Sequence, residues 1–356
     1  MAHSTRTYLT LYLTGGYLLL IIYASLYPLS GWHDSGSDAL AFLGAAWPRY
    51  TTGFDLATNV IAYLPFGFFC TAALRHRLAP LSAWLAAVLF GACLSFAMEW
   101  LQNYLPSRVP SNLDLACNTA GALLGGMFGA RWGSRALDEG RLARWRQRVM
   151  MQAYGVDIGV LLIGAWLMTQ LSPETLLFGS GNLRRMLDLP PVQPFLPERF
   201  INLESVIAAT GLLAAGLMST LLLRRNARLL TAGLLVAALL IKALAHALLM
   251  GPAAAVAWIT PGNSLGIAVG FGLWWSASFL VFPLQRAVAA LALLFATVMV
   301  NVAPENPYLL NTLHIWNPGQ FLNFNGLTRL ICSLWPFLAL PWLMIYRPER
   351  NNALNY

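Results

Sequence analysis

Long apolar runs separated by short polar connections dominate the pattern along this 356-residue chain. A run of about 20 apolar residues is long enough for a helix to cross a bilayer, and Pro, Gly and Arg mark the ends of successive runs. Ten segments have this character: 8–29, 54–74, 82–104, 113–132, 154–172, 201–223, 230–250, 262–282, 286–303 and 328–346. The pattern predicts an all-α polytopic membrane protein with about ten transmembrane helices.

The composition excludes an ordinary soluble protein, because 58% of the residues are hydrophobic and only 10% are charged, against about 25% charged residues in soluble domains. Lys and Arg number 22 and Asp and Glu 14, a net charge of +8. Arginine gathers in the cytoplasmic loops of membrane proteins, so we expect membrane lipids and no nucleic acid as partners. The cysteines and histidines lack metal-ligand spacing, and we expect no metal and no cofactor.

Arginine is distributed unevenly between the two sides of the predicted membrane. Alternate connections place fifteen arginines on the side of the two termini and five on the other, namely Arg49, Arg108, Arg184, Arg185 and Arg199. The asymmetry predicts that the N- and C-termini are cytoplasmic. A basic linker at 136–153 belongs to an arginine-rich loop, 130–152, in which Trp132 and Trp145 lie among the arginines. This suits a helix lying on anionic head groups. A docking surface for a protein partner is the alternative.

An internal repeat emerges when the chain is compared with itself at an offset of about 145 residues. The segment from Asn118 to Gly125 falls on the segment from Asn263 to Gly270, each with the pattern Asn-x-x-Gly-x-x-x-Gly. We therefore expect two four-helix repeats in the same orientation, 1–135 and 154–285, followed by two C-terminal helices in 286–356. Small residues at this spacing let helices approach closely, which assigns helix packing to Gly121, Gly125, Gly266 and Gly270.

Polar residues gather at one end of three helices in the first repeat, where the second helix starts, the third ends and the fourth starts. The candidate ligand-binding residues are Asp55, Asn59, Glu99, Gln102, Arg108, Asp114 and Asn118. Polar groups in a membrane are costly and therefore functional candidates. We expect one outward-opening pocket in which Arg108 forms an ion pair with Glu99 or Asp114.

These residues also have structural interpretations. Asp114 is a favoured residue type for capping a helix, Arg108 could neutralise Glu99, and Asn118 could join two helices. The number of polar residues at one end favours a site, and the corresponding segment of the second repeat, 242–263, keeps Lys242, His246 and Asn263 but has no acid.

The motifs resemble those of the VanZ-like family of bacterial membrane proteins over residues 8–135. The resemblance rests on the run Asn59-Val-Ile-Ala-Tyr-Leu-Pro-Phe-Gly67, on Glu99-Trp-Leu-Gln102, on Arg108, and on the run from Asp114 to Gly125. It implies a relative of a protein associated with resistance to the glycopeptide teicoplanin, in the bacterial cytoplasmic (inner) membrane. Asn59 stands where some relatives carry His, so no role of His is carried over.

Three functions compete on these observations. The first is engagement of a lipid-linked head group, a cell-wall precursor or an anionic phospholipid, at the extracytoplasmic leaflet, with a link to envelope biogenesis. The second is an enzyme that modifies this head group with Glu99 or Asp114 as the base. The third is a transporter. The residues leave open whether the protein catalyses a reaction, and they identify no protein partner.

Overall fold

The computed structural model describes residues 9–34, 36, 38–47, 53–134, 141–151, 153–187, 189–304 and 322–347. Helices account for all regular secondary structure within these ranges, apart from one isolated bridge between Met150 and Leu223. A helix lies at each of the ten segments that the hydrophobic pattern selects. The prediction of an all-helical polytopic membrane protein is confirmed.

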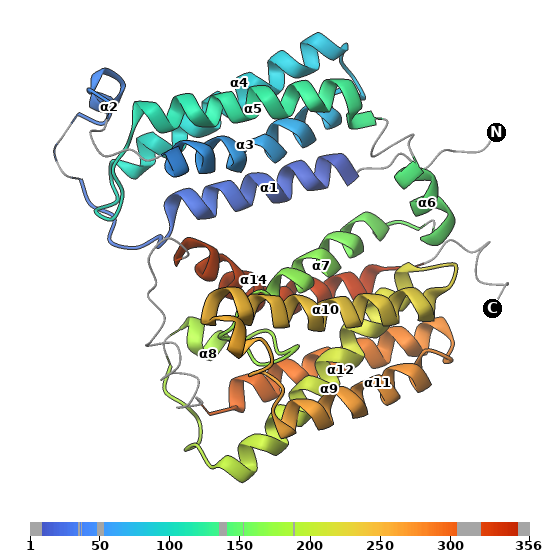
Figure 1. Cartoon of the computed structure of the whole chain (residues 1–356). Helices are drawn as coiled ribbons and strands as arrows, with labels where there is room; N and C mark the ends of the chain where they lie inside the picture. The colour runs from blue at the N-terminus through green and yellow to red at the C-terminus, as the bar shows by residue number, and fades with distance from the viewer. Residues whose placement is uncertain are drawn as a thin grey trace. The chain divides into compact units, whose positions relative to one another are not determined.

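The chain divides into two units, Met1–Arg146 and Gln147–Tyr356 (Figure 1). The helices of the N-terminal unit are α1 (Leu9–Leu26), α2 (Ala41–Gly44), α3 (Gly53–Leu74), α4 (Pro80–Gln102) and α5 (Asn112–Ser134). The division falls within α6 (Arg141–Val149), a short arginine-rich helix. In the N-terminal unit α3, α4 and α5 pack along one another, and α1 packs against α3 and α4.

The C-terminal unit is built around one buried helix, α9. Its helices are α7 (Val156–Thr169), α8 (Leu183–Met186), α9 (Pro197–Leu222), α10 (Ala227–Met250), the 3-10 helix η2 (Pro252–Ala254), α11 (Pro261–Ala277), α12 (Phe282–Val302) and α14 (Leu322–Ile345). In the most apolar stretch of α9, 89% of the residues are buried. The helices α7, α10, α11 and α12 all contact it.

Seven of the helices that the structure describes are long and apolar enough to cross a membrane: α1, α3, α4, α9, α10, α12 and α14. The other three predicted spans differ in length or polarity. The helices α7 and α11 have only 14 and 17 residues. The helix α5 has 23 residues but carries Asn112, Asp114 and Asn118 in its first half. The count of ten spans therefore stays a prediction.

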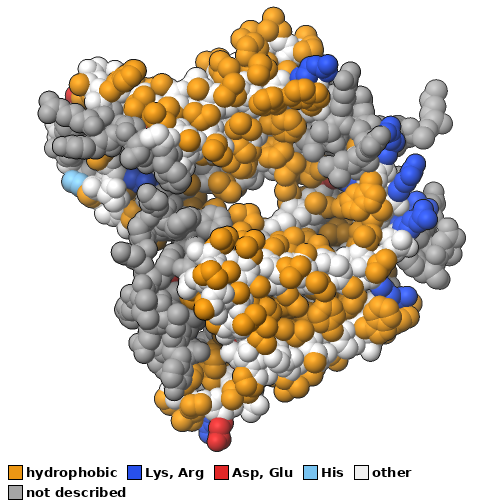
Figure 2. Space-filling model, in the orientation of Figure 1, with side chains coloured by type: hydrophobic (Ala, Val, Ile, Leu, Met, Phe, Trp, Pro, Cys, Tyr) orange, Lys and Arg blue, Asp and Glu red, His pale blue; other side chains and the backbone are white. Residues whose placement is uncertain are grey.

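Hydrophobic side chains cover most of the visible face of each unit (Figure 2). On α10, exposed side chains recur every four residues at Val236, Leu240, Leu244 and Leu248, and Leu248 is 74% exposed. A soluble protein rarely exposes a continuous apolar surface of this kind. A lipid bilayer accounts for it, because lipid chains are as apolar as these residues.

Glycines bring α5 against α3 in the N-terminal unit. A Cβ atom at Gly121 would collide with the backbone carbonyl of Val60, and one at Gly125 with that of Leu64. The two backbones therefore pack with no side chain between them at these positions.

The same packing joins α11 to α9 in the C-terminal unit. There a Cβ atom at Gly266 would lie 2.6 Å from the carbonyl oxygen of Ser205, and one at Gly270 would lie 3.0 Å from that of Ala209. All four of these residues are 145 positions beyond their counterparts at Gly121, Val60, Gly125 and Leu64. The duplication stays a prediction, and this shared register is the observation that supports it.

Candidate functional site

Two of the predicted site residues link α3 to α5 near the start of both helices. The side-chain amide of Asn59 donates a hydrogen bond of 2.8 Å to Oδ1 of Asp114. Both side chains are half-buried. Asp114 lies in the first turn of α5, where the helix dipole favours a negative charge. The hydrogen bond therefore links α3 to α5, while both side chains stay partly accessible.

Glu99 joins the end of α4 to the start of α5. Its Oε2 accepts a hydrogen bond of 2.8 Å from the backbone N–H of Ser111. The hydroxyl of Ser111 in turn accepts a hydrogen bond of 3.3 Å from the backbone N–H of Asp114, as an N-terminal helix cap does. Glu99 is only 3% exposed, so its carboxylate is a structural partner of the α5 cap.

Arg108 binds the end of α1 and not a carboxylate, which differs from the expected ion pair. Its Nε donates to the carbonyl of Tyr27 at 3.2 Å, and its Nη2 donates to the carbonyls of Ala24 at 3.0 Å and Tyr27 at 3.1 Å. No ion pair joins Arg108 to Glu99 or Asp114 in the part of the chain that the structure describes. The physical reason is that the last carbonyls of a helix lack intrahelical donors and carry partial negative charge.

The environment of Arg108 leaves it charged. Burial lowers the pKa of its guanidinium from the ordinary value, and the negative charge of Glu99 opposes that shift. Arginine stays protonated in proteins.

Gln102 also contacts the end of α1, since its side-chain amide donates to the carbonyl of Ser25 at 2.9 Å. The end of α1 is thus a part of the site that the sequence analysis did not include.

Asn118 and Asp55 stand apart from the contacts above. Asn118 lies one turn deeper than Asp114, and its amide donates to the hydroxyl of Ser95 at 2.9 Å. Its Oδ1 is buried and has no hydrogen-bond partner among the residues that the structure describes. Asp55 lies in the first turn of α3, and its side chain is outside the described residues. The structure therefore joins Asn59, Glu99 and Asp114 in one connected network. It places Gln102 and Arg108 against the end of α1, and Asn118 in the interior.

The sequence analysis missed a buried acid in the second unit, because it compared only residues 242–263 of the second repeat with the polar residues of the first. Glu204 of α9 is 6% exposed. Its Oε2 accepts from the hydroxyl of Thr260 at 2.5 Å, and its Oε1 accepts from the amide of Asn263 at 3.0 Å. Glu204 lies 145 positions after Asn59, so the repeat offset itself was the signal that could have found it.

The described residues contain no group of three or more His, Cys, Asp or Glu side chains that could hold a metal ion. The polar groups at the end of the N-terminal unit are instead amides, carboxylates and one guanidinium. Such groups can bind phosphate, hydroxyl and amide groups through hydrogen bonds.

The segment that contains most of α1, all of α3 and α4 and most of α5 also carries a family signature. Residues 13–131 match the VanZ/LLP1 family model. The match confirms the resemblance and includes all seven predicted site residues, from Asp55 to Asn118. We refer to this segment as the VanZ-like unit. No curated protein and no solved structure matches the chain.

Proposed function

We propose that the VanZ-like unit binds the head group of an anionic, lipid-linked molecule at the end where α1 and α4 end and α5 begins. One observation carries the proposal. Arg108 is half-buried and held through Nε and Nη2, while its Nη1 makes no hydrogen bond to any described residue. The guanidinium is therefore fixed in place, retains its charge and keeps donors for an incoming anion.

The chemistry of arginine identifies the class of ligand. A planar guanidinium suits phosphate and carboxylate groups because it donates two parallel hydrogen bonds. Anionic phospholipids and lipid-linked cell-wall precursors both present phosphate next to the apolar part of the molecule. The half-buried pair of Asn59 and Asp114 supplies further hydrogen-bonding groups for hydroxyls or amides of the head group.

The location of this end relative to the membrane is part of the proposal. The arginine asymmetry favours the extracytoplasmic leaflet of a bacterial cytoplasmic membrane, with both termini in the cytoplasm. The link to envelope biogenesis and glycopeptide resistance depends on the family resemblance alone.

An enzyme that modifies the same head group is the second candidate, and one observation favours Asp114 over Glu99 as its base. Asp114 is half-buried, whereas Glu99 is 3% exposed and bound to the backbone of Ser111. A general base must lie within hydrogen-bond reach of the proton that it removes. An incoming head group would reach Asp114 first.

Lipid binding by purified full-length protein tests the proposal. Native mass spectrometry with added phosphatidylglycerol compares the wild type with Arg108→Ala, Arg108→Lys and Arg131→Ala. Arg131 is an exposed arginine in the last turn of α5 and serves as the matched control. We expect Arg108→Ala to weaken binding about tenfold, since a charged hydrogen bond contributes about 1.5–3 kcal/mol. Arg108→Lys should restore little, because Lys lacks the planar fork.

Equal binding by the Arg108→Ala and Arg131→Ala proteins, at equal thermal stability, would contradict the proposal. Chemical change of the bound lipid that disappears in Asp114→Asn would favour the enzyme.

A further inference from the structure

A buried, non-helical loop separates α7 from α8 in the C-terminal unit, over residues 170–182. Ser172 is 1% exposed, and Leu177 and Phe178 are each 2% exposed. Irregular backbone in a membrane protein is tolerated only where protein surrounds it or where it lines a cavity. Such a loop between short helices is a frequent feature of ligand sites in membrane proteins.

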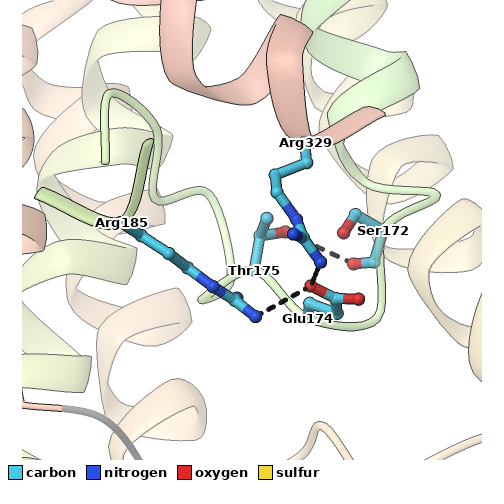
Figure 3. A network of polar contacts seen from close by, with 5 residues as sticks. All are labelled: Ser172, Glu174, Thr175, Arg185 and Arg329. Carbon is cyan, nitrogen blue, oxygen red and sulfur yellow. Dashed lines mark hydrogen bonds and ion pairs between the residues drawn. The ribbon is translucent and has the colours of Figure 1, made fainter. Parts of the chain in front are cut away.

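The loop collects charged side chains from three other elements. Within the loop, Oε2 of Glu174 contacts the guanidinium Nη2 of Arg185, from α8, at 3.1 Å and that of Arg329, from α14, at 2.5 Å (Figure 3). Lys242 of α10 donates from Nζ to the carbonyl oxygens of Ser172 at 2.7 Å and Thr175 at 2.9 Å. These two carbonyls belong to residues on either side of Glu174.

The cations outnumber the acid in this cluster. Lys242, Arg185 and Arg329 supply three positive charges, and Glu174 supplies one negative charge. Lys242 is 1% exposed, and its ammonium contacts only carbonyl oxygens among the residues that the structure describes. A buried charge without a counter-ion costs several kcal/mol, so the cluster favours the approach of an anion.

The two arginines give an anion a route of access. The side chain of Glu174 is 7% exposed, whereas those of Arg185 and Arg329 are 32% and 44% exposed. Each guanidinium uses one nitrogen on the same carboxylate oxygen, and Figure 3 shows the two side chains reaching Glu174 from different directions. Further N–H donors of both arginines remain for a second oxygen-rich group.

We propose that Arg185 and Arg329 form a binding site for a phosphate group in the C-terminal unit, with Glu174 holding the two guanidinium groups together when the ligand is absent. The phosphate belongs either to a lipid head group or to a free anion, since both present the same oxygens. This site lies outside the VanZ-like unit and shares no residue with the Arg108 site.

The variant Glu174→Gln distinguishes a ligand site from a cluster whose role is purely structural. A Gln side chain removes the negative charge that competes with an anion for both arginines. We therefore expect Glu174→Gln to bind phosphate more tightly than the wild type, by about threefold to tenfold, a typical size for a nearby charge change of about 1 kcal/mol. Arg329→Ala and Arg185→Ala should each weaken binding about tenfold.

The measurement uses purified full-length protein and two probes. Inorganic phosphate is titrated while thermal unfolding is followed, and phosphatidylglycerol is added in native mass spectrometry. Arg228→Ala is the matched control, because Arg228 belongs to the same unit and is held by Ser278 and the ring of Phe279. The Arg108→Ala protein is measured alongside and should retain this binding, which separates this site from the Arg108 site.

Response to phosphate alone would identify a free anion as the ligand, and response to lipid would identify a head group. Weaker binding in Glu174→Gln, or equal binding in Arg329→Ala, Arg185→Ala and Arg228→Ala, would overturn the proposal. If Glu174→Gln does not fold, the two arginine variants decide the question.

Discussion

The carboxylate of Glu99 and the backbone nitrogen of Ser111 lie 2.8 Å apart, which ties the end of α4 to the start of α5. The first N–H groups of a helix have no partner within the helix. The hydroxyl of Ser111 caps the N–H of Asp114, and Glu99 takes the N–H of Ser111 itself. A residue that the sequence offers as a catalytic candidate is therefore an integral part of the helix connection.

Removal of the Glu99 carboxylate should destabilise the protein. Glu99→Ala leaves the buried N–H of Ser111 without an acceptor, at a cost of about 1–3 kcal/mol. Glu99→Gln keeps an oxygen acceptor and should cost less. Thermal unfolding of the purified variants checks this order. Glu198→Ala changes an exposed acid in the first turn of α9 and is the control; an equal effect of Glu99→Ala and Glu198→Ala would show that the Ser111 contact contributes nothing.

The sequence predicted the helices well because apolar length is a strong signal in membrane proteins. It also predicted that α3, α4 and α5 bring their polar ends together, and the contacts of Asn59 with Asp114 and of Glu99 with Ser111 are consistent with that. Antiparallel connection of α4 and α5 by a short loop is enough to bring their ends together.

The sequence could not predict the partners of Arg108. Its acceptors are backbone carbonyls of Ala24 and Tyr27, and every helix end offers such carbonyls regardless of its residue types. The choice of α1 depends on how α1 packs against α3 and α4, which the apolar pattern does not encode. A nearby carboxylate therefore looked like the better partner.

Substitution of glycine by alanine should stabilise the protein at an exposed glycine and destabilise it at the closely packed Gly121 and Gly266. Gly→Ala at an exposed helix position should stabilise by up to about 1 kcal/mol. Gly164 of α7 is exposed, and apart from its chain neighbours and the backbone of its own helix no described atom lies within 4 Å of its Cβ position, so it should show this gain. At Gly121 and Gly266 the new methyl group would meet the carbonyls of Val60 and Ser205, and overpacking costs about 1–3 kcal/mol.

Thermal unfolding of the three alanine variants checks the sign at each glycine. Stabilisation at Gly121 or Gly266 would mean that their helices separate easily. Similar losses at both would be consistent with a duplicated helix pair.

The arginine asymmetry predicts the topology of the VanZ-like unit. We expect reporter fusions after Arg77 and within 136–153 to be cytoplasmic, and a fusion after Arg108 to be extracytoplasmic. Alkaline phosphatase and green fluorescent protein fusions provide the measurement, because the first is active only outside and the second only inside. An active phosphatase at 136–153 would reverse the topology and move the Arg108 site to the cytoplasmic leaflet.

Exchange of the amide and the acid between α3 and α5 should preserve their hydrogen bond. Asn59→Asp alone puts two carboxylates at the position of the present 2.8 Å contact, and like charges at this distance repel. Asp114→Asn alone removes the charge that favours the start of α5.

The double variant, Asn59→Asp with Asp114→Asn, pairs a carboxylate on α3 with an amide on α5. The C-terminal unit has a similar bond one turn further along, since Glu204 of α9, the counterpart of Asn59, accepts at 3.0 Å from Asn263 of α11, the counterpart of Asn118. We therefore expect the double variant to recover most of the stability lost in Asn59→Asp, with a coupling energy of about 0.5–3 kcal/mol in a double-mutant cycle of unfolding free energies. Additive losses would show that the two side chains act independently.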